Sequence, residues 1–203
     1  MKSVEEFYQE IKGISIGQQR QELLLEIAKG IQQNLDKNIR LNLLFVCTHN
    51  SRRSQFGQLW ASYFSQILGF SEYISCFSAG TEATECNIRT IRALESAGFR
   101  AQFSVCQPNP KYDLFSGKEV SPIRLFSKTI DDSSLPKENI VALMTCSDAE
   151  ENCPYVNGTL LKFSLNYKDP KEFDNTLEEK EAYWLKSKEI ASEILFILKH
   201  LKK

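Results

Sequence analysis

The sequence predicts an α/β protein built around a parallel β-sheet. Short apolar runs that suit buried strands alternate with longer stretches in which apolar residues recur at helical spacing. This alternation is typical of parallel strands joined by right-handed crossovers, with helices on both faces of the sheet. We therefore expect a three-layer sandwich around a four-stranded parallel sheet. The candidate strands are the runs at residues 41–47, 73–78, 140–145 and 160–163.

Length and composition restrict the class of protein. The 203 residues suit one domain with a well-buried core. A formal net charge of -1 and a pI near 6.2 give no global reason to expect binding to nucleic acid or to an anionic membrane. No apolar run approaches the roughly 20 residues that cross a bilayer, and the first residues lack the apolar core of a secretion signal. We expect a cytoplasmic protein, either a monomer or a homodimer.

Residues 1–39 are predicted to form a helical extension. Phe7 and Ile11 make a short apolar stripe, and no residues with catalytic chemistry gather in this part of the chain. We expect the extension to pack on the core or on a partner subunit. The α/β domain then occupies residues 40–203. A longer stripe in the extension consists of Leu23, Leu24, Ile27, Ala28 and Ile31.

Helices and one irregular region are expected beyond the first strand. One helix runs from Gln55 onward and stops at Gly69, and another lies between a cap at Asn87 and a stop at Gly98. Prolines break up residues 101–139, which we interpret as an inserted loop or hairpin near the rim of the site. Strand-like runs in this region lie at residues 112–115 and 123–126. The last helix is marked by an apolar stripe at Tyr183, Ile190, Ile194, Leu195 and Leu198.

The stretch from Cys47 to Ser54 has the features of an oxyanion-binding loop. An apolar strand ends at Cys47, a tight loop follows, and a helical pattern begins after Ser54. In such a loop backbone N–H groups converge, and the positive end of the helix dipole points at them. Arg53 can bind an oxyanion through two parallel hydrogen bonds, and the same field would keep Cys47 as a nucleophilic thiolate. Ser54 can donate a hydrogen bond to the Cys47 sulfur. Singly, these residues also suit a core cysteine beside surface arginines, but the combination favours the functional interpretation.

The pattern Cys47-x5-Arg53-Ser54 after a strand resembles the phosphate loop of low-molecular-weight protein tyrosine phosphatases and of thioredoxin-coupled arsenate reductases. The resemblance begins near Leu41. It implies the flavodoxin-like fold of these phosphatases, with Cys47 as nucleophile, and residues 78–81 resemble a segment that shapes one wall beside the loop. The oxyanion-binding residues that it implies are Thr48, His49, Asn50, Ser51, Arg52, Arg53 and Ser54.

Two residues of this loop depart from the pattern of the families that it resembles. His49 stands where both families usually have glycine, so its side chain must point away from the bound anion or alter which anion fits. Arg52 adds a positive charge beside the site. Thr48, Asn50 and Ser51, in contrast, are similar to the reductase version of the loop.

A second cysteine motif separates the candidate functions. Cys146 follows a buried strand, as Cys47 does, so parallel strands would bring the two thiols near each other at one edge of the sheet. Cys153 lies seven residues further on, and one helix over that span would separate the two by about 10 Å along its axis. Because a disulfide needs Cα atoms within roughly 7 Å, a Cys146–Cys153 bond requires the segment to unwind. Pro154 disfavours helix at Cys153 and so makes the unwound form accessible.

Spacing alone leaves open that Cys146 and Cys153 are unrelated thiols. A zinc site is not expected, because no cysteine or histidine cluster completes four ligands. The run Cys-Ser-Asp-Ala-x-x-Asn-Cys-Pro at residues 146–154 resembles the redox segment of thioredoxin-coupled arsenate reductases, which simple phosphatases of the same fold do not need. The resemblance implies a disulfide relay among Cys47, Cys146 and Cys153, with thioredoxin as electron donor and no bound cofactor or metal.

A general acid is expected on the turn after the last strand. An Asp-Pro pair begins at Asp169, and although such pairs are common in turns, both resembling families carry one here whose aspartate protonates the departing oxygen. The resemblance therefore implies that Asp169 is the acid. Lys171 and Glu172 follow where phosphatases usually have aromatic residues, which weakens a tyrosine phosphatase interpretation. The fallback acids are Asp148 and Asp174.

These observations lead to the hypothesis of an arsenate reductase in which Cys47, Cys146 and Cys153 form a thioredoxin-reduced relay. The alternative is a low-molecular-weight protein tyrosine phosphatase that hydrolyses phosphomonoesters through a phosphocysteine at Cys47, with the other two cysteines as bystanders or a redox off-switch. A third class is a non-catalytic oxyanion sensor, against which the intact nucleophile, arginine and acid argue. Phosphate and arsenate are alike in shape and charge, so only the redox motif favours the reductase.

Overall fold

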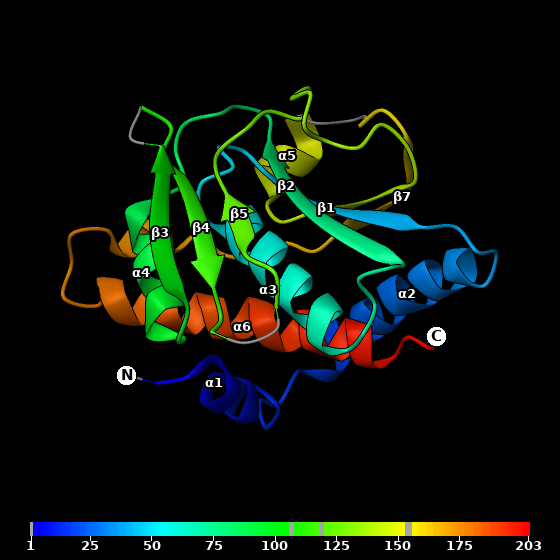
Figure 1. Cartoon of the computed structure of the whole chain (residues 1–203), viewed down its shortest axis with the longest axis horizontal. Helices are drawn as coiled ribbons and strands as arrows, with labels where there is room; N and C mark the ends of the chain where they lie inside the picture. The colour runs from blue at the N-terminus through cyan, green and yellow to red at the C-terminus, as the bar shows by residue number, and fades with distance from the viewer. Residues whose placement is uncertain (1, 106–107, 118–119, 153–155) are drawn as a thin grey trace.

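Four parallel strands form the central sheet, in the order β2-β1-β6-β7 (Figure 1). The structure is a computed structural model that describes residues 2–105, 108–117, 120–152 and 156–203. It confirms the predicted α/β fold, and each strand begins and ends within two residues of its predicted bounds. The strands are β1 (Leu41–Cys47), β2 (Ile74–Gly80), β6 (Ile140–Met144) and β7 (Thr159–Ser164).

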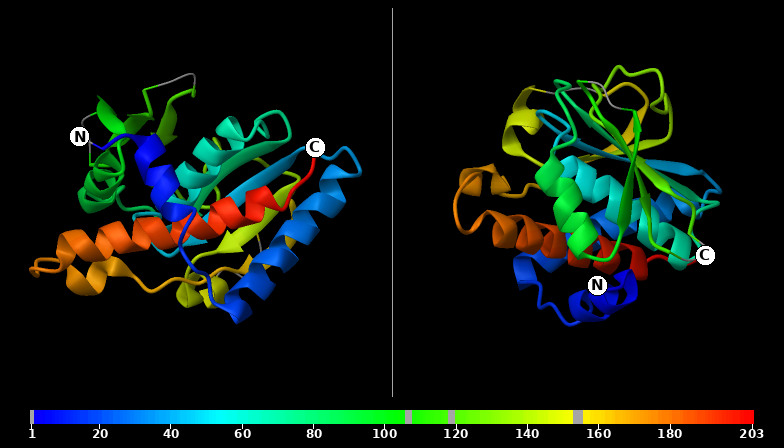
Figure 2. Two further views of the ribbon diagram at one scale, coloured as in Figure 1. Left: turned by 90° about the horizontal axis from the view of Figure 1, so that it is seen from below. Right: turned by 60° about the vertical axis from the view of Figure 1, so that its left-hand side comes forward.

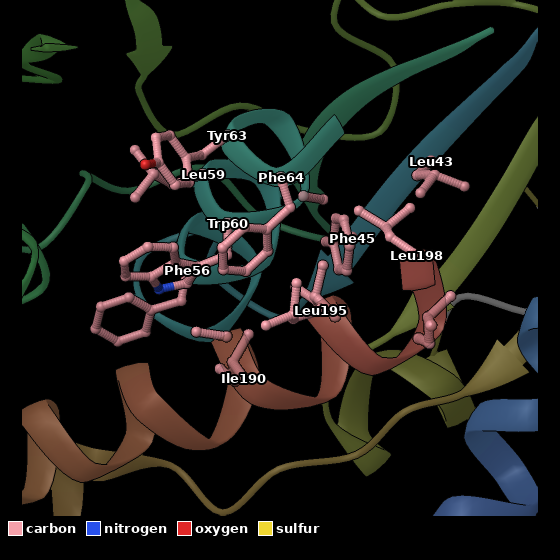
Figure 3. Packing of buried hydrophobic residues seen from close by; sticks show 14 of the residues in the cluster. Leu43, Phe45, Phe56, Leu59, Trp60, Tyr63, Phe64, Ile190, Leu195 and Leu198 are labelled. Atoms are coloured by element: carbon pink, nitrogen blue, oxygen red, sulfur yellow. The ribbon is translucent and has the colours of Figure 1, made fainter. Parts of the chain in front are cut away.

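Both faces of the sheet are buried along its central strands β1 and β6, whose alternate residues face opposite sides. Leu43 and Phe45 of β1 belong to the larger hydrophobic core, which α3 (Arg53–Ile67) and α6 (Glu179–Lys199) help to form. Figure 3 shows side chains of β1, α3 and α6 meeting in this core. Leu44 and Val46 belong to a smaller cluster on the other face, beneath the short helix α5 (Ser147–Asn152). The sheet is thus the middle layer of the predicted sandwich.

The N-terminal residues form two helices that pack on the body of the chain. These are α1 (Val4–Ile11) and α2 (Gln18–Leu35), and Figure 2 shows α2 running beside α6. The ring of Phe7 stacks on that of Trp60, with centroids 4.6 Å apart, so α1 closes the core over α3. No helix in the described part of the chain is long and apolar enough to span a bilayer.

A second, three-stranded antiparallel sheet follows α4 (Ile88–Ser96). The predicted cap at Asn87 is confirmed, since its side chain accepts a hydrogen bond from the N–H of Arg89. The predicted stop at Gly98 has φ +104°, a conformation that favours glycine. The second sheet consists of β3 (Arg100–Val105), which the sequence analysis did not predict, β4 (Lys111–Phe115) and β5 (Ile123–Leu125).

After β5 the chain turns toward the carboxyl edge of the central sheet. There the N–H of Gly80 donates to the carbonyl of Lys128 over 2.9 Å, and Gly80 pairs with Thr129 in an isolated parallel bridge. This brings residues 126–129 against the loop that follows Cys47. A 3-10 helix, η1 (Pro170–Phe173), lies between β7 and α6 and completes the elements around that edge.

Candidate active site

Cys47 is the last residue of β1 and has only 3% of its surface exposed. It begins the loop of residues 47–54, which we call the oxyanion loop. Ser54 Oγ lies 3.1 Å from Cys47 Sγ and is fully buried in the first turn of α3. Because the Asn50 amide donates to Ser54 Oγ over 2.8 Å, that oxygen already accepts one hydrogen bond and its own proton can point at the sulfur. The expected Ser54–Cys47 hydrogen bond thus has suitable geometry.

Asn50 fixes the turn of the oxyanion loop. Its backbone has φ +45°, in the left-handed region that asparagine tolerates better than most residues. Its side-chain oxygen accepts from the backbone N–H of Lys128 over 2.9 Å, and its carbonyl accepts from Gln55 Nε2 over 2.7 Å. The Lys128 N–H can only donate, so it identifies the Asn50 oxygen and leaves the amide nitrogen as the donor to Ser54.

Gly80, the last residue of β2, forms a wall beside this loop. A Cβ at this position would lie 2.6 Å from the carbonyl oxygen of Thr48 and 2.7 Å from the nitrogen of Asn50. Only glycine lets two backbones approach so closely. The N–H of Glu82 donates to the same Thr48 carbonyl over 2.8 Å, which ties the wall to the loop.

The centre of the oxyanion loop presents donors to an anion. The backbone N–H groups of residues 49–53 donate to no acceptor within the part of the chain that the structure describes. They precede or begin α3, a helix of 15 residues whose positive dipole end lies at Arg53. A left-handed residue next to such a helix start produces the concave arrangement of N–H groups that binds oxyanions. The predicted oxyanion loop therefore has the backbone form that its chemistry needs.

Arg53 of the oxyanion loop and Asp169, the expected acid, lie in direct contact. The two Arg53 Nη atoms donate to the carbonyl of Tyr167 over 3.0 Å and to Asp169 Oδ2 over 2.6 Å. The remaining guanidinium nitrogen, Nε, is buried and has no partner among the described residues, so it is a donor that a bound oxyanion can use. The other carboxylate oxygen of Asp169 accepts the N–H of Lys171 and so caps η1. We call residues 166–174, which carry this carboxylate, the acid segment.

The two fallback acids have other positions. Asp174 binds the guanidinium of Arg52 over 3.4 Å and accepts the hydroxyl proton of Tyr183 over 2.7 Å. Asp148 lies on α5 and is exposed. Asp169, in contrast, contacts Arg53 of the oxyanion loop directly.

Two residues assigned to oxyanion binding on sequence have side chains with protein partners. The buried Arg52 donates from Nε to Tyr183 Oη over 2.7 Å, in addition to its contact with Asp174. Burial, followed by the hydrogen bond to Asp174, raises the pKa of Tyr183, so its hydroxyl stays protonated. His49 Nδ1 lies 3.2 Å from Glu82 Oε2 but without the alignment of a hydrogen bond. The imidazole therefore sits on the Gly80 side of the loop.

The backbone of the loop is also held from α4. The carbonyl of Ser51 accepts the N–H of Asn87 over 3.1 Å and the hydroxyl of Thr90 over 3.3 Å. Ser51 thus contributes to the shape of the loop through its main chain.

Cys146 lies at the carboxyl end of β6, next to β1, as predicted. Only 2% of its surface is exposed, and it belongs to the same buried cluster as Cys47. Thr48 Oγ1 of the oxyanion loop lies 3.5 Å from Cys146 Sγ, and the N–H of Ala149 donates to that sulfur over 3.4 Å. Cys153 and Pro154 lie outside the described residues. Within the described ranges, no group of three or more His, Cys, Asp or Glu side chains is placed to hold a metal ion.

Three residues that organise the site were missed on sequence. Gln55 Nε2 bridges the carbonyls of Asn50 and Phe126, and Lys128 supplies the N–H that orients the Asn50 side chain. The Lys128 ammonium is buried, and burial lowers its pKa to about 8. Tyr183 was counted only as part of an apolar stripe. No local pattern marks these residues, because each reaches the loop through tertiary contacts.

Comparison with known proteins finds relatives that match this chain in sequence over more than half of its length. No protein-family profile matches the chain. Arsenate reductase 1 of Staphylococcus saprophyticus is 30% identical over 130 residues, which are 63% of this chain and 77% of that protein. The arsenate reductase of Staphylococcus aureus strain Newman is 30% identical over 128 residues, again 63% of this chain and 77% of that protein.

Solved structures share the fold at lower identity. The low-molecular-weight protein tyrosine phosphatase from T. tengcongensis has a TM-score of 0.55 and 18% identity, over 79% of this chain and 99% of that one. The low-molecular-weight phosphotyrosine phosphatase from Vibrio cholerae O395 has a TM-score of 0.51 and 15% identity, over 78% and 95% of the two chains. The fold and the similarity in sequence together show that this chain belongs to the low-molecular-weight protein tyrosine phosphatase superfamily and, within it, to the arsenate reductase family.

Proposed function

We propose that this protein is an arsenate reductase that works through a relay of thiols and is reduced by thioredoxin. The position of Cys146 carries the proposal. Its sulfur lies in the same buried cluster as Cys47 and 3.5 Å from Thr48 Oγ1 of the oxyanion loop. A reductase needs a second thiol at this point, whereas a phosphoester hydrolase does not. Similarity to arsenate reductases over 130 residues supports the same activity.

The first step is attack on arsenate bound in the oxyanion loop. The N–H groups of residues 49–53 and Arg53 neutralise the anion, and the unpartnered Arg53 Nε is one such donor. The Cys47 thiolate, which Ser54 Oγ can stabilise from 3.1 Å, attacks arsenic and forms a sulfur–arsenic bond. An arsenic–oxygen bond breaks, and Asp169 gives its proton to the departing oxygen, which leaves as water.

The second step transfers two electrons to arsenic. The Cys146 thiolate attacks the Cys47 sulfur of the adduct, and a Cys47–Cys146 disulfide forms. The sulfur–arsenic bond breaks with its electron pair left on arsenic, so As(V) becomes As(III) and arsenite leaves. Burial of Cys146 beside the loop keeps this attack intramolecular, which favours it over reaction with thiols in solution.

The relay then moves the disulfide outward. The Cys153 thiolate attacks Cys146, Cys47 leaves as a thiolate, and a Cys146–Cys153 disulfide remains for reduction by the dithiol of thioredoxin. The intervening helix α5 must unwind for this bond to form. It has six residues, well short of the roughly 12–15 at which isolated helices become even marginally stable, so unwinding costs few hydrogen bonds. The scheme needs no bound cofactor and suits a reducing compartment such as the cytoplasm.

The alternative function is hydrolysis of phosphomonoesters. Cys47, Arg53 and Asp169 suit phosphoryl transfer through a phosphocysteine as well as they suit arsenate reduction, because the oxyanion loop contacts only features that the two anions share. The fold is also that of protein tyrosine phosphatases. A non-catalytic oxyanion sensor would not need the Asp169–Arg53 pair.

Arsenate-dependent oxidation of NADPH, coupled through thioredoxin reductase and thioredoxin, tests the proposal. The wild type should turn over many times, whereas Cys153→Ser should stop after one cycle. Cys76→Ser is the matched control, because Cys76 lies on β2 and contacts Ser65 rather than the oxyanion loop. It should turn over like the wild type.

Hydrolysis of p-nitrophenyl phosphate by the same three proteins separates the two functions. If none reduces arsenate but all hydrolyse the ester, the reductase proposal is wrong and the protein is a phosphatase. If none does either, both enzymatic proposals are wrong.

A further inference from the structure

Arg52 differs from the rest of the oxyanion loop because its side chain leaves the loop and enters the protein. It is buried, and its Nε donates to Tyr183 Oη over 2.7 Å. Its Nη2 lies 3.4 Å from Asp174 Oδ2, while Tyr183 Oη donates to the other oxygen of that carboxylate over 2.7 Å. The three groups form a closed triangle in which each contacts the other two.

The triangle is extended by α4. Arg89 Nε lies 3.7 Å from Asp174 Oδ1 and 2.7 Å from Glu179 Oε2, and Arg89 Nη2 donates to Asn175 Oδ1 over 2.9 Å. Asp174 therefore lies between two guanidinium groups and a tyrosine hydroxyl. Both oxygens of this carboxylate are engaged by neighbouring side chains, Oδ1 by Tyr183 and Arg89 and Oδ2 by Arg52. Its contacts indicate an anchor.

The anchor lies at one end of the acid segment. Asp174 directly follows η1, and Asp169 caps the start of that four-residue helix. Arg53 holds the beginning of the segment through Tyr167 O and Asp169, and Arg52 holds its end through Asp174. Two adjacent residues of the oxyanion loop thus bind the two ends of the segment that carries the acid.

We propose that Arg52 is a positioning residue: through Tyr183 and Asp174 it fixes the acid segment relative to the oxyanion loop and so aims Asp169 at the departing oxygen. The inference rests on the proposed role of Asp169 as general acid. A single turn of 3-10 helix has few hydrogen bonds of its own, so its orientation depends on such external contacts. General acids act only within hydrogen-bonding reach of the group that they protonate, so a small rotation of the segment matters.

The dependence of kcat/KM on the basicity of the leaving group measures how well Asp169 is positioned. Phenyl phosphate has a basic leaving group that needs protonation, whereas p-nitrophenyl phosphate has a weakly basic one that needs little. Tyr183→Phe removes the shared hydroxyl but keeps the buried ring. We expect Tyr183→Phe to lower kcat/KM about tenfold or more for phenyl phosphate, but less than about threefold for p-nitrophenyl phosphate. The larger effect is a fraction of the roughly 100-fold or larger rate enhancement that a general acid contributes.

Ser187→Ala is the matched control on the same helix. It removes a buried α3–α6 hydrogen bond, from Trp60 Nε1 to Ser187 Oγ over 3.0 Å, one turn beyond Tyr183. We expect it to lower the melting temperature, as Tyr183→Phe does, while the ratio of the two esters stays that of the wild type. An equal change of the ratio in both variants would reduce the role of Tyr183 to stability and overturn the proposal.

Arg52→Lys separates position from charge. Lysine keeps the positive charge but cannot contact Tyr183 and Asp174 with a planar fork. If Arg52 is a positioning residue, Arg52→Lys should shift the ratio of kcat/KM for the two esters as Tyr183→Phe does. Inhibition by inorganic phosphate should change little. If instead the ratio is unchanged and phosphate inhibits more weakly, Arg52 is an oxyanion ligand and the proposal fails.

Amide hydrogen exchange over residues 168–176 provides a readout that needs no activity. Exchange should be faster in Tyr183→Phe than in the wild type or in Ser187→Ala. If the wild type hydrolyses neither ester, phosphatase chemistry is absent and exchange alone decides. Unchanged exchange in Tyr183→Phe would then overturn the positioning role of Arg52. Faster exchange would support that role, whatever reaction the site performs.

Discussion

On one side of the oxyanion loop four arginines, including Arg89, contact the acid segment. On the other side, among the described residues, two weak contacts hold the sulfur of Cys146. Arg53 and Arg52 bind the two ends of the acid segment from within the loop. Arg20, from the N-terminal extension, donates to the carbonyl of Asn166 over 3.3 Å while its Nε pairs with Glu193 over 2.8 Å. The acid side is therefore fixed from three directions.

The side of the loop that carries Cys146, which we call the thiol side, is held by fewer contacts. Within the part of the chain that the structure describes, Cys146 Sγ contacts the Thr48 hydroxyl at 3.5 Å and the Ala149 N–H at 3.4 Å, and sulfur is a weak hydrogen-bonding partner in both. The helix that follows, α5, has only six residues. Burial of Cys146 and Ala149 in the smaller core helps to hold its first turn in place.

The difference corresponds to what each side must do in the proposed reaction. Proton transfer and oxyanion stabilisation work best in a fixed geometry. A relay that carries a disulfide from Cys47 outward needs a segment that can leave its place. The described residues therefore place many charged contacts on one side of the loop and few on the other, and substitutions on the two sides should have different consequences.

Cys47→Ser should produce the largest effect. Arsenate reduction and ester hydrolysis should both fall at least about a thousandfold, because both need the thiolate that stands between the two sides. Arsenate-dependent oxidation of NADPH and hydrolysis of p-nitrophenyl phosphate measure the two activities. Retention of either activity would show that a different nucleophile performs it.

Cys146→Ser should abolish the function of the thiol side and leave the acid side intact. Arsenate turnover should be lost completely, while kcat/KM for p-nitrophenyl phosphate stays within about threefold of the wild type, because Cys146 acts only after the first bond is made. Equal losses in both assays would mean that Cys146 shapes the oxyanion loop rather than carrying electrons.

Asp169→Asn should act on the acid side. We expect the rate of the first step to fall about 100-fold or more, with a larger loss for phenyl phosphate than for p-nitrophenyl phosphate. Inhibition by inorganic phosphate should remain, because the loop donors are intact. A larger loss in Asp174→Asn than in Asp169→Asn would transfer the acid role to Asp174.

Gly80→Ala should damage the wall beside the oxyanion loop. The new Cβ would meet the backbone at Thr48 and Asn50, which cannot move away as a flexible side chain can. We expect the free energy of unfolding to fall by about 2–3 kcal/mol in urea titrations. Gly13→Ala is the control, because its Cβ has ordinary contacts only, and a similar loss there would rule out the steric explanation.

Lys128→Met should have the smallest effect and the clearest pH dependence. Burial lowers the pKa of this lysine from 10.5 to about 8, so the charged form is disfavoured in the folded state. The charged Lys128 therefore destabilises the folded wild type by about 3 kcal/mol below pH 8, and this destabilisation disappears as pH rises toward 10.5. The hydrogen bond from Lys128 to the carbonyl of Phe126, which the variant lacks, offsets part of it. Lys128→Met should thus be more stable than the wild type by about 1–3 kcal/mol at pH 7. Unfolding titrations at pH 7 and pH 10 test this, and a gain that does not shrink with pH would contradict it.

Local sequence patterns predicted the fold and the placement of Cys47 and Cys146 at one edge of the sheet. Apolar runs end at Cys47 and Cys146 because parallel strands must be buried on both faces, and their carboxyl ends meet at one edge. Asn87 and Gly98 mark helix ends by their own backbone chemistry. In each case the signal lies within a few residues of the feature that it marks.

The supports of the site lack such local signals. Tyr183 occupies a helix stripe that suits any buried aromatic residue, and only the fold reveals that its hydroxyl meets Arg52. Lys128 comes from a stretch interpreted as an inserted loop or hairpin, yet its backbone orients Asn50. Arg52 was expected to add charge beside the anion because its sequence neighbours do so, and its contacts 122 and 131 residues away could not be inferred from spacing.

A single-turnover experiment on Cys153→Ser tests the central claim most directly. The protein is mixed with excess arsenate in the absence of thioredoxin, alkylated rapidly, and examined for arsenite and for disulfides by mass spectrometry. A thiol relay predicts one arsenite per protein molecule and a Cys47–Cys146 disulfide, with neither product formed by Cys146→Ser. Absence of arsenite, or equal arsenite from Cys146→Ser, would contradict the relay.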